Sequence, residues 1–102
     1  MNSIRVTSTD VGVTILVAGD LDIGSAPSVF QAVVEASGAG ELHVSVDLSE
    51  VDLIDWAGLG AIVGALWRMR TAGGELVIAS PSDATKAALD ASRVAEIIEI
   101  EG

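Results

Sequence analysis

The chain has 102 residues, half of them hydrophobic and none of them cysteine, so we expect one domain over residues 1–102 with an aliphatic core and no disulfide. Fifteen acidic residues against five basic ones give a formal net charge of −10. This charge argues against direct binding of nucleic acid or of an anionic membrane, because both require clustered Lys and Arg side chains, and it favours a basic or mixed protein partner.

The first part of the chain predicts two strands and a helix. Residues 4–8 alternate apolar and polar side chains, and the turn at residues 10–12 leads to a second strand over residues 13–18, apolar enough to be buried on both faces. Residues 19–24 are predicted to form a loop. Ser25 is the expected N-cap of a first helix, with Pro27 in its first turn and residues 38–40 ending it. The expected buried stripe of this helix is Val29, Phe30, Val33 and Val34.

The central stretch, residues 44–66, changes its period after Asp55. Residues 44–48 alternate as a strand does, and a short acidic turn leads on to Asp55. Asp55 is placed to cap a helix that begins close to Trp56 and ends with Arg68 and Arg70. The expected buried stripe of this helix is Leu59, Ile62, Val63, Leu66 and Met69, with Trp67 in the core or half-buried.

Gly58 and Gly60 lie within the first turns of this second helix. A glycine there weakens a helix by roughly 0.5 to 1 kcal/mol relative to alanine. We therefore expect something to approach the helix closely at its start.

The last third predicts a strand over residues 75–79, a helix over residues 82–91 and a short edge strand through Ile98 and Ile100, whose alternating glutamates discourage strand addition. The expected packing face of the helix is Ala84, Ala87, Ala88 and Ala91. This order predicts an α/β fold: a mixed central sheet of four to five strands with helices mainly on one face. The segments at residues 20–24 and 55–60 each follow a strand and open a helix, so they should meet at the carboxyl edge.

Three segments in order resemble the STAS domain family, the bacterial anti-sigma factor antagonists and their relatives. They are Gly19-Asp20-Leu21-Asp22-Ile23-Gly24-Ser25-Ala26-Pro27, Val46-Asp47-Leu48-Ser49 and Ile54-Asp55-Trp56-Ala57-Gly58-Leu59-Gly60, followed by Gly73-Gly74 before a strand. The resemblance implies a single STAS domain that binds an anti-sigma factor of the serine-kinase type and releases a sigma factor. In the family the kinase phosphorylates a hydroxyl residue directly after the aspartate. Trp56 stands at that position and Ala57 at the next, which implies an antagonist not switched by phosphorylation.

The resemblance implies a partner-binding surface of seven residues: Asp20, Asp22, Asp55, Trp56, Ala57, Gly58 and Leu59. Each also has a structural interpretation. Trp56 is either an exposed anchor for a partner or a ring folded back against Leu21 or Ile23. Asp55 is equally explained as a helix cap, and the loop with Asp20 and Asp22 could cap itself. Ser49 is the remaining candidate for a relocated phosphoacceptor.

A second functional hypothesis stays open. The stand-alone STAS subunits of lipid-transporting ABC systems read Asp, one variable residue and then Ala-Gly-Leu, as residues 55–59 do here. Such a subunit binds the transporter ATPase. Gly60 and residues 19–27, in contrast, resemble the sigma-regulating members of the family more closely. An exposed Trp56 could equally bind a second copy of the chain, which allows a weak homodimer.

Enzymatic activity is not expected. The sequence contains no Ser/His/Asp set, no P-loop and no GxGxxG after a strand. His43 is the only histidine and has no companion ligands, so we expect neither a metal nor a cofactor. The N-terminus has no apolar core of signal-peptide length and no run of the sequence reaches the length of a membrane span, which predicts a cytoplasmic protein without membrane insertion.

Overall fold

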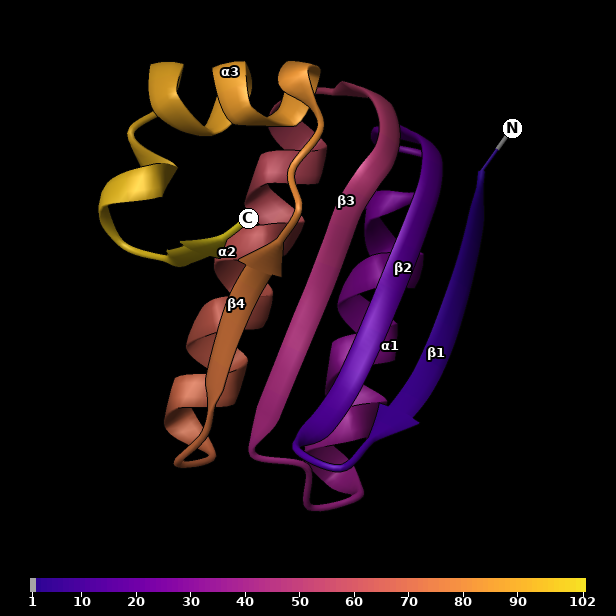
Figure 1. Cartoon of the computed structure of the whole chain (residues 1–102), viewed down its shortest axis with the longest axis vertical. Helices are drawn as coiled ribbons and strands as arrows, with labels where there is room; N and C mark the ends of the chain where they lie inside the picture. The colour runs from indigo at the N-terminus through magenta and orange to yellow at the C-terminus, as the bar shows by residue number, and fades with distance from the viewer. Residues whose placement is uncertain (1) are drawn as a thin grey trace.

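A mixed sheet with the strand order β1-β2-β3-β4-β5 organises the computed structural model, which describes residues 2–102 (Figure 1). β1 is antiparallel to β2, and all other neighbours are parallel. The strands are β1 (Ser3–Thr9), β2 (Gly12–Leu21), β3 (His43–Ile54), β4 (Glu75–Ala79) and β5 (Glu99–Glu101). The helices are α1 (Ala26–Gly38), α2 (Trp56–Thr71), α3 (Asp83–Ala91) and a short 3₁₀ turn, η1 (Val94–Glu96). The predicted fold class is confirmed.

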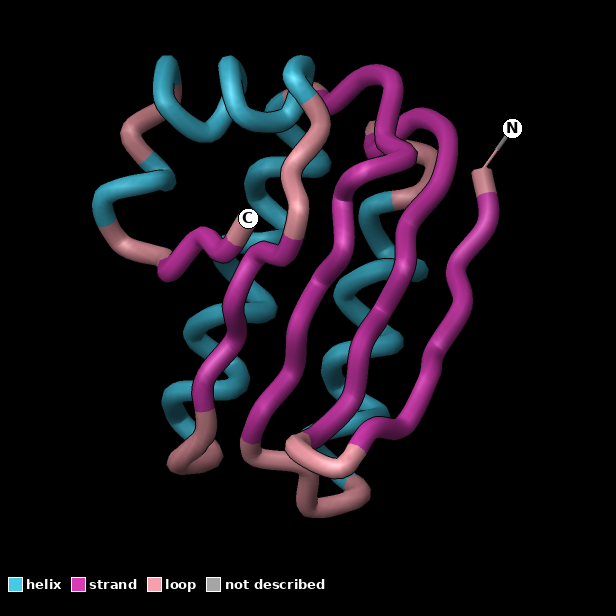
Figure 2. The backbone as a smooth tube through the Cα atoms, in the orientation of Figure 1, coloured by secondary structure: helices cyan, strands magenta, loops and turns pink. Residues whose placement is uncertain are grey.

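The hydrophobic core lies between the sheet and the helices α1 and α2, which run behind the strands in Figures 1 and 2. Burial along β2 therefore alternates: Val13, Ile15 and Val17 face the helices and are buried, whereas Thr14 and Leu16 on the open face are half-exposed. The prediction that this strand is buried on both faces was wrong, because helices cover only one face of the sheet.

β2 and β3 continue further than their sequence patterns predicted. β2 includes Asp20 and Leu21, which were expected in a loop, and β3 runs without a turn to Ile54. The pairing of β2 with β3 shifts register twice, between residues 16 and 18 and between residues 19 and 20. After these shifts Asp20 lies opposite Leu53 and Leu21 lies opposite Ile54. With these irregularities the two strands stay paired up to the segments that precede the following helices.

The helices follow their predicted bounds closely, but their predicted buried faces are only partly correct. In α2, Leu59, Ile62, Leu66 and Met69 are buried as expected, and Val63 is half-buried. The expectation that Trp67 lies in the core or is half-buried was wrong, because its side chain is exposed. In α1, Val29 and Val33 are buried with Ala26 and Ala36, while Phe30 and Val34 are half-buried.

The packing face predicted for α3 was wrong except at Ala88, which is half-buried against the core. Thr85 and Leu89 are its buried residues, whereas Ala84, Ala87 and Ala91 are exposed. The N-cap Ser82 explains the orientation of the helix, because its hydroxyl donates to the Val51 carbonyl oxygen (2.7 Å) and accepts from the Thr85 N–H (3.2 Å). α3 is thereby attached to the end of β3 by its first turn, beside α2 (Figure 1).

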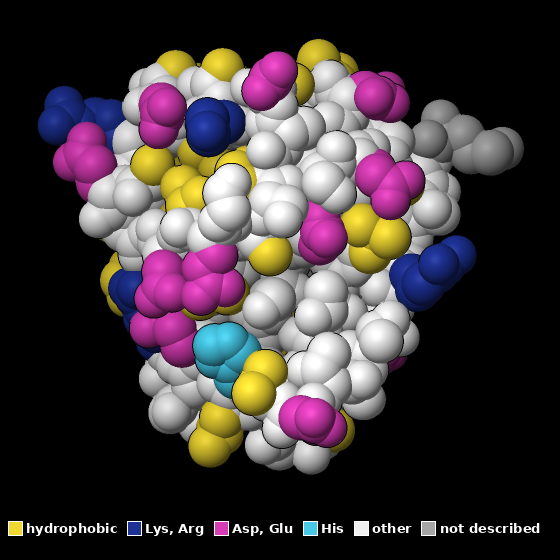
Figure 3. All heavy atoms as spheres, viewed as in Figure 1, with side chains coloured by type: hydrophobic (Ala, Val, Ile, Leu, Met, Phe, Trp, Pro, Cys, Tyr) yellow, Lys and Arg dark blue, Asp and Glu magenta, His cyan; other side chains and the backbone are white. Residues whose placement is uncertain are grey.

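The two edge strands differ in charge. β5 carries Glu99 and Glu101, and Figure 3 shows acidic side chains gathered beside the histidine on the open face of the sheet. A hydrogen bond with the Glu101 carboxyl, partial desolvation and the negative charges of Glu101 and Glu75 raise the pKa of Glu99, against an opposing effect of His43. β1 (SIRVTST) carries no acidic residue. Within residues 2–102, no helix combines the length and apolar character needed to cross a membrane.

Candidate functional site

The candidate site lies where β2 and β3 end and α2 begins. The Asp55 N–H donates to the Leu21 carbonyl oxygen (3.2 Å), which joins the two strand ends directly. The segments at residues 20–24 and 55–60 therefore meet at the carboxyl edge of the sheet, as the sequence predicted.

Asp55 is the N-cap of α2. Its backbone is extended (φ −110°, ψ −174°), and its Oδ1 accepts a hydrogen bond from the Gly58 N–H at 2.9 Å. A carboxylate in this position satisfies one of the free N–H groups of the first turn and lies at the positive end of the helix dipole, which together stabilise a helix by about 1 kcal/mol. The predicted cap is confirmed.

The two glycines of the first turns occupy different environments. A Cβ added to Gly58 would overlap the Leu21 carbonyl oxygen and come within 2.9 Å of Ile54 Cγ1, so the helix can approach the strand ends only without a side chain there. A Cβ added to Gly60 would meet nothing within 4 Å. The expectation of close approach is confirmed for Gly58, whereas no part of the described chain approaches Gly60.

Trp56, the first residue of α2, is 79% exposed. The interpretation in which its ring folds back against Leu21 or Ile23 was wrong, because Leu21 is completely buried under the helix start and Ile23 is itself exposed. The ring instead borders a shallow cleft of about 250 Å³ between the start of α2 and α3. The cleft is lined by Ile54, Asp55, Trp56, Leu59, Ala88, Ala91 and Ser92.

The Asp22 side chain holds the turn that precedes α1, and no side chain caps the helix itself. Asp22 Oδ1 accepts from the N–H groups of Gly24 (3.0 Å) and Ser25 (3.2 Å). Ser25 is the N-cap by position, but its hydroxyl is buried, donates to the Asp20 carbonyl oxygen (2.7 Å) and accepts from the Asp22 N–H (3.0 Å). Ser25 makes no side-chain cap, because its hydroxyl is directed to the backbone of Asp20 and Asp22.

The three aspartates of the site therefore have different roles. Asp22 and Asp55 use one carboxylate oxygen each to hold the local backbone. The Asp20 carboxylate, half-exposed at the end of β2, makes no side-chain hydrogen bond or ion pair to any residue between 2 and 102. Of the three carboxylates, Asp20 is the one with both oxygens available for another molecule.

The remaining predicted site residues lie beneath this surface. Leu59 is 7% exposed, Gly58 is buried and Ala57 is half-buried. Leu59 reaches the surface as a wall of the cleft, whereas Gly58 supports Trp56 by allowing the helix start to pack on the strands.

Residues beyond the predicted set also contribute to this region. Positions 56, 60, 63 and 67 share one side of α2 at helical spacing, and both Trp56 and Trp67 are exposed on it. The guanidinium of Arg70 lies 5.3 Å from the ring centre of Trp67. The spacing could have revealed this outer face from the sequence, but the α3 residues of the cleft could not be found without the position of α3.

The chain belongs to the STAS domain family, whose sequence pattern matches residues 3–102. It is 33% identical over 100 residues to a protein of Listeria monocytogenes named anti-sigma-B factor antagonist, covering 97% of this chain and 88% of the relative.

Solved structures show the same fold at lower identity. One is a crystal structure of a putative anti-sigma factor antagonist from Thermotoga maritima, with a TM-score of 0.88 and 24% identity over 97% of this chain and 86% of that one. Another is an anti-sigma factor antagonist from Mycobacterium paratuberculosis, with a TM-score of 0.88 and 18% identity over 99% and 86% of the two chains.

The groups at the start of α2 include no phosphate acceptor at the first two helix positions. Neither Trp56 nor Ala57 carries a hydroxyl, and Ser49 lies back along β3, where its N–H donates to Asp47 Oδ1 (2.9 Å). Within residues 2–102 no group of three or more His, Asp or Glu side chains is arranged to hold a metal ion. The site offers an exposed aromatic ring, an apolar cleft and an available carboxylate.

Proposed function

We propose that this chain is an anti-sigma factor antagonist that binds an anti-sigma factor of the serine-kinase type and so releases a sigma factor. The proposed binding surface is centred on Trp56, with Asp20, Asp22, Asp55, Ala57, Gly58 and Leu59 around and beneath it. The observation that carries the proposal is the 79% exposure of Trp56 at the position where the family has its phosphoacceptor. The names of the relatives support the same function.

The chemistry of the surface fits a protein partner. A large ring left in water at a helix start is costly unless something covers it, and tryptophan is enriched among interface residues whose truncation costs about 2 kcal/mol or more. The adjacent cleft of about 250 Å³ could receive an aliphatic side chain of the partner beside the ring. Asp20 could accept a hydrogen bond from a basic or polar group at the rim.

Gly60 adds a second argument for a partner. It costs the helix stability, and no residue of the described chain uses the space it leaves. It lies on the same side of α2 as Trp56 and Trp67. A partner that packs along this side could therefore approach the helix backbone closely between the two rings.

In this proposal the antagonist is active without a phosphorylation switch. A phosphate at a helix N-terminus would add close to two negative charges beside Asp55, about 1.5 to 2 at neutral pH, and would repel or redirect a partner. Because Trp56 and Ala57 accept no phosphate, the surface stays in its binding form. Release of the sigma factor must then be controlled by the amount of the antagonist or by its partner. We propose no catalytic activity and a cytoplasmic location.

The alternative function, a subunit bound to the ATPase of a lipid-transporting ABC system, is favoured by one feature only. Ala57-Gly58-Leu59 agrees with the sequence of those subunits. The relatives reported above are named as antagonists, which favours the first function.

Co-purification from the native cytoplasm tests the proposal. Wild type, Trp56→Ala and Trp67→Ala are used as baits, and bound proteins are identified by mass spectrometry. We expect a kinase-fold anti-sigma factor with the wild type, its loss with Trp56→Ala, and at most partial loss with Trp67→Ala. A transporter ATPase in its place would support the alternative. Equal recovery of the anti-sigma factor with wild type and Trp56→Ala would remove Trp56 from the interface.

A further inference from the structure

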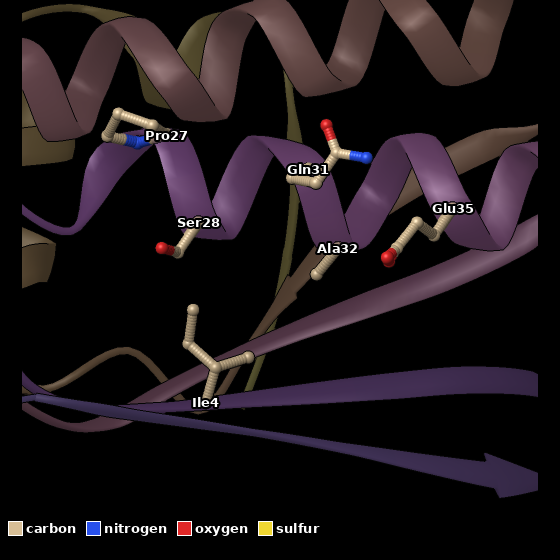
Figure 4. A pocket seen from close by; sticks show the side chains of 6 residues that line it. All are labelled: Ile4, Pro27, Ser28, Gln31, Ala32 and Glu35. Carbon is tan, nitrogen blue, oxygen red and sulfur yellow. The ribbon is translucent and has the colours of Figure 1, made fainter.

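The free edge of β1 borders a groove that the proposed function does not use. Figure 4 shows Ile4 pointing from β1 toward α1, while Ser28, Ala32 and Glu35 line the opposite wall. This hollow has a volume of about 550 Å³. A second hollow of about 390 Å³ shares Ala32 and Glu35 with it and continues past Val6 to Glu41. Together they form the β1–α1 groove, which follows the edge of the sheet.

The groove exists because α1 covers the inner face of β1 only in part. α1 lies behind β2 in Figure 1, and β1 lies at the outer side of this helix. The side chains that β1 turns toward the helix layer are paired with core residues of β2, Ile4 with Val17 and Val6 with Ile15. Val6 nevertheless remains 55% exposed, whereas Val17 and Ile15 are completely buried. The inner face of β1 is therefore only partly packed, because Ile4 is half-buried against the core whereas Val6 is largely uncovered.

The backbone of β1 is equally open. β1 pairs with β2 along its seven residues and with no other strand, so alternate N–H and C=O groups point away from the sheet. Natural edges of this kind are usually protected by charge, as β5 is by Glu99 and Glu101. β1 has no acidic residue and no proline, and its one charged residue, Arg5, is on the open face, where it pairs with Leu16.

The dimensions suit an added strand. α1 has 13 residues and is therefore about 20 Å long at 1.5 Å per residue. An extended segment of about six residues spans the same length at 3.3 Å per residue. A strand hydrogen-bonded to β1 would direct every second side chain into the groove, onto Ile4, Val6 and Ala32.

The charges of the groove indicate which segment would fit. Glu35 and Glu41 lie along it, and neither has an ion-pair partner within residues 2–102. A second copy of the chain is a poor occupant, because β1 pairing with β1 would bring both sets of glutamates together between two molecules of net charge −10. A segment with apolar side chains and a Lys or Arg facing the groove would fit both features. Its apolar side chains would pack on the apolar residues of the groove, and its basic side chain would pair with a glutamate.

We propose that β1 and the β1–α1 groove form a docking site for an extended segment of a partner protein, which adds to the sheet edge and presents apolar and basic side chains to α1. This site is separate from the Trp56 surface, at the opposite edge of the sheet from α3 (Figure 1). The mode of recognition is strand addition: backbone hydrogen bonds provide affinity, and the groove selects side chains.

The test uses an acetylated and amidated probe peptide, Thr-Val-Thr-Lys-Thr-Val-Thr, which presents Val, Lys and Val to one face in either chain direction. It is titrated into the ¹⁵N-labelled full chain, with amide shifts and hydrogen exchange as readouts. We expect shifts in β1 and along the facing side of α1, with slower exchange at alternate β1 amides. The same shifts should appear in Trp56→Ala, which separates this site from the proposed antagonist surface.

Charge-matched variants make the test specific. Glu35→Gln should lower the affinity for the peptide about two- to five-fold, which is the effect of losing one exposed ion pair. Asp90→Asn, with the same change of charge on the exposed side of α3, should leave its affinity unchanged. A control peptide with Glu in place of Lys should bind more weakly than the Lys peptide.

The proposal is overturned by the absence of β1 shifts, by equal affinity of the two peptides, or by equal effects of Glu35→Gln and Asp90→Asn. β1 shifts that depend on protein concentration without peptide would show that a second copy occupies the edge, which also overturns it.

Discussion

The inner and outer sides of α2 make opposite use of the same residue type. Gly58, on the inner side, is required by the fold itself, because the Leu21 carbonyl oxygen occupies the space of its missing side chain. Gly60, two residues later, has open space around it and lies between the exposed rings of Trp56 and Trp67. The inner side is explained completely by packing within the chain, whereas the outer side has features that packing within the chain does not require. This difference is the physical basis for placing a partner on the outer side.

The largest effect is expected for Gly58→Ala. The added Cβ would push α2 away from the ends of β2 and β3, and overpacking against a backbone atom cannot be relieved by rotating a side chain. We expect a loss of about 3 kcal/mol in the free energy of unfolding, at the upper end of overpacking effects, measured by urea denaturation. A stability within error of the wild type would show that the helix start is looser than its contacts indicate.

Trp56→Ala should affect binding and leave folding unchanged. The exposed ring contributes little to the core, so the free energy of unfolding should change by no more than about 0.5 kcal/mol. Affinity for the anti-sigma factor should fall by about 2 kcal/mol, or roughly 30-fold, measured by titration calorimetry. Trp67→Ala is the control of equal size on the same helix. A larger loss of affinity in Trp67→Ala than in Trp56→Ala would move the centre of the interface along α2.

Asp55→Ala tests the contribution of the N-cap of α2 to stability. Loss of the hydrogen bond to the Gly58 N–H should destabilise the chain by about 1 kcal/mol, seen as a lower urea midpoint with an unchanged m-value. Asp55→Asn should recover most of this loss, because an amide oxygen also caps. Asp52→Ala, an exposed aspartate of β3, controls for the change in net charge. An equal effect of Asp52→Ala would attribute the loss to charge and not to the cap.

Gly60→Ala should change the free energy of unfolding less than Gly58→Ala does, and with the opposite sign. Alanine is favoured over glycine inside a helix by about 0.5 to 1 kcal/mol, and its methyl group would meet no atom of the chain. We expect a higher melting temperature together with weaker binding of the anti-sigma factor. If the variant is more stable and binds equally well, the partner does not approach the helix backbone at this position.

Much of the fold was accessible from local patterns. The change from a period of two to a period of about 3.6 near Asp55 located the boundary between β3 and α2, and the polar cap residue at that boundary was identified correctly. The extension of β2 through Asp20 was missed, because Gly19 and Asp20 resemble a loop locally and are held in the strand by pairing with β3. The buried face of α3 was missed for a related reason: its orientation is set by Ser82 contacting Val51, 31 residues away.

The candidate site divides in the same way. The sequence alone determined which residues stand at the start of α2, that none of them accepts a phosphate at the family position, and that Asp55 caps the helix. Those properties depend on residue identity and on contacts within a few positions. Tertiary structure alone decided that Trp56 is exposed, that α3 supplies the other wall of its cleft, that Gly58 and Gly60 have opposite surroundings, and that β1 is left partly uncovered beside a groove. Each of these depends on how distant elements are placed in space, and a linear pattern carries no information about which neighbours a side chain meets or lacks.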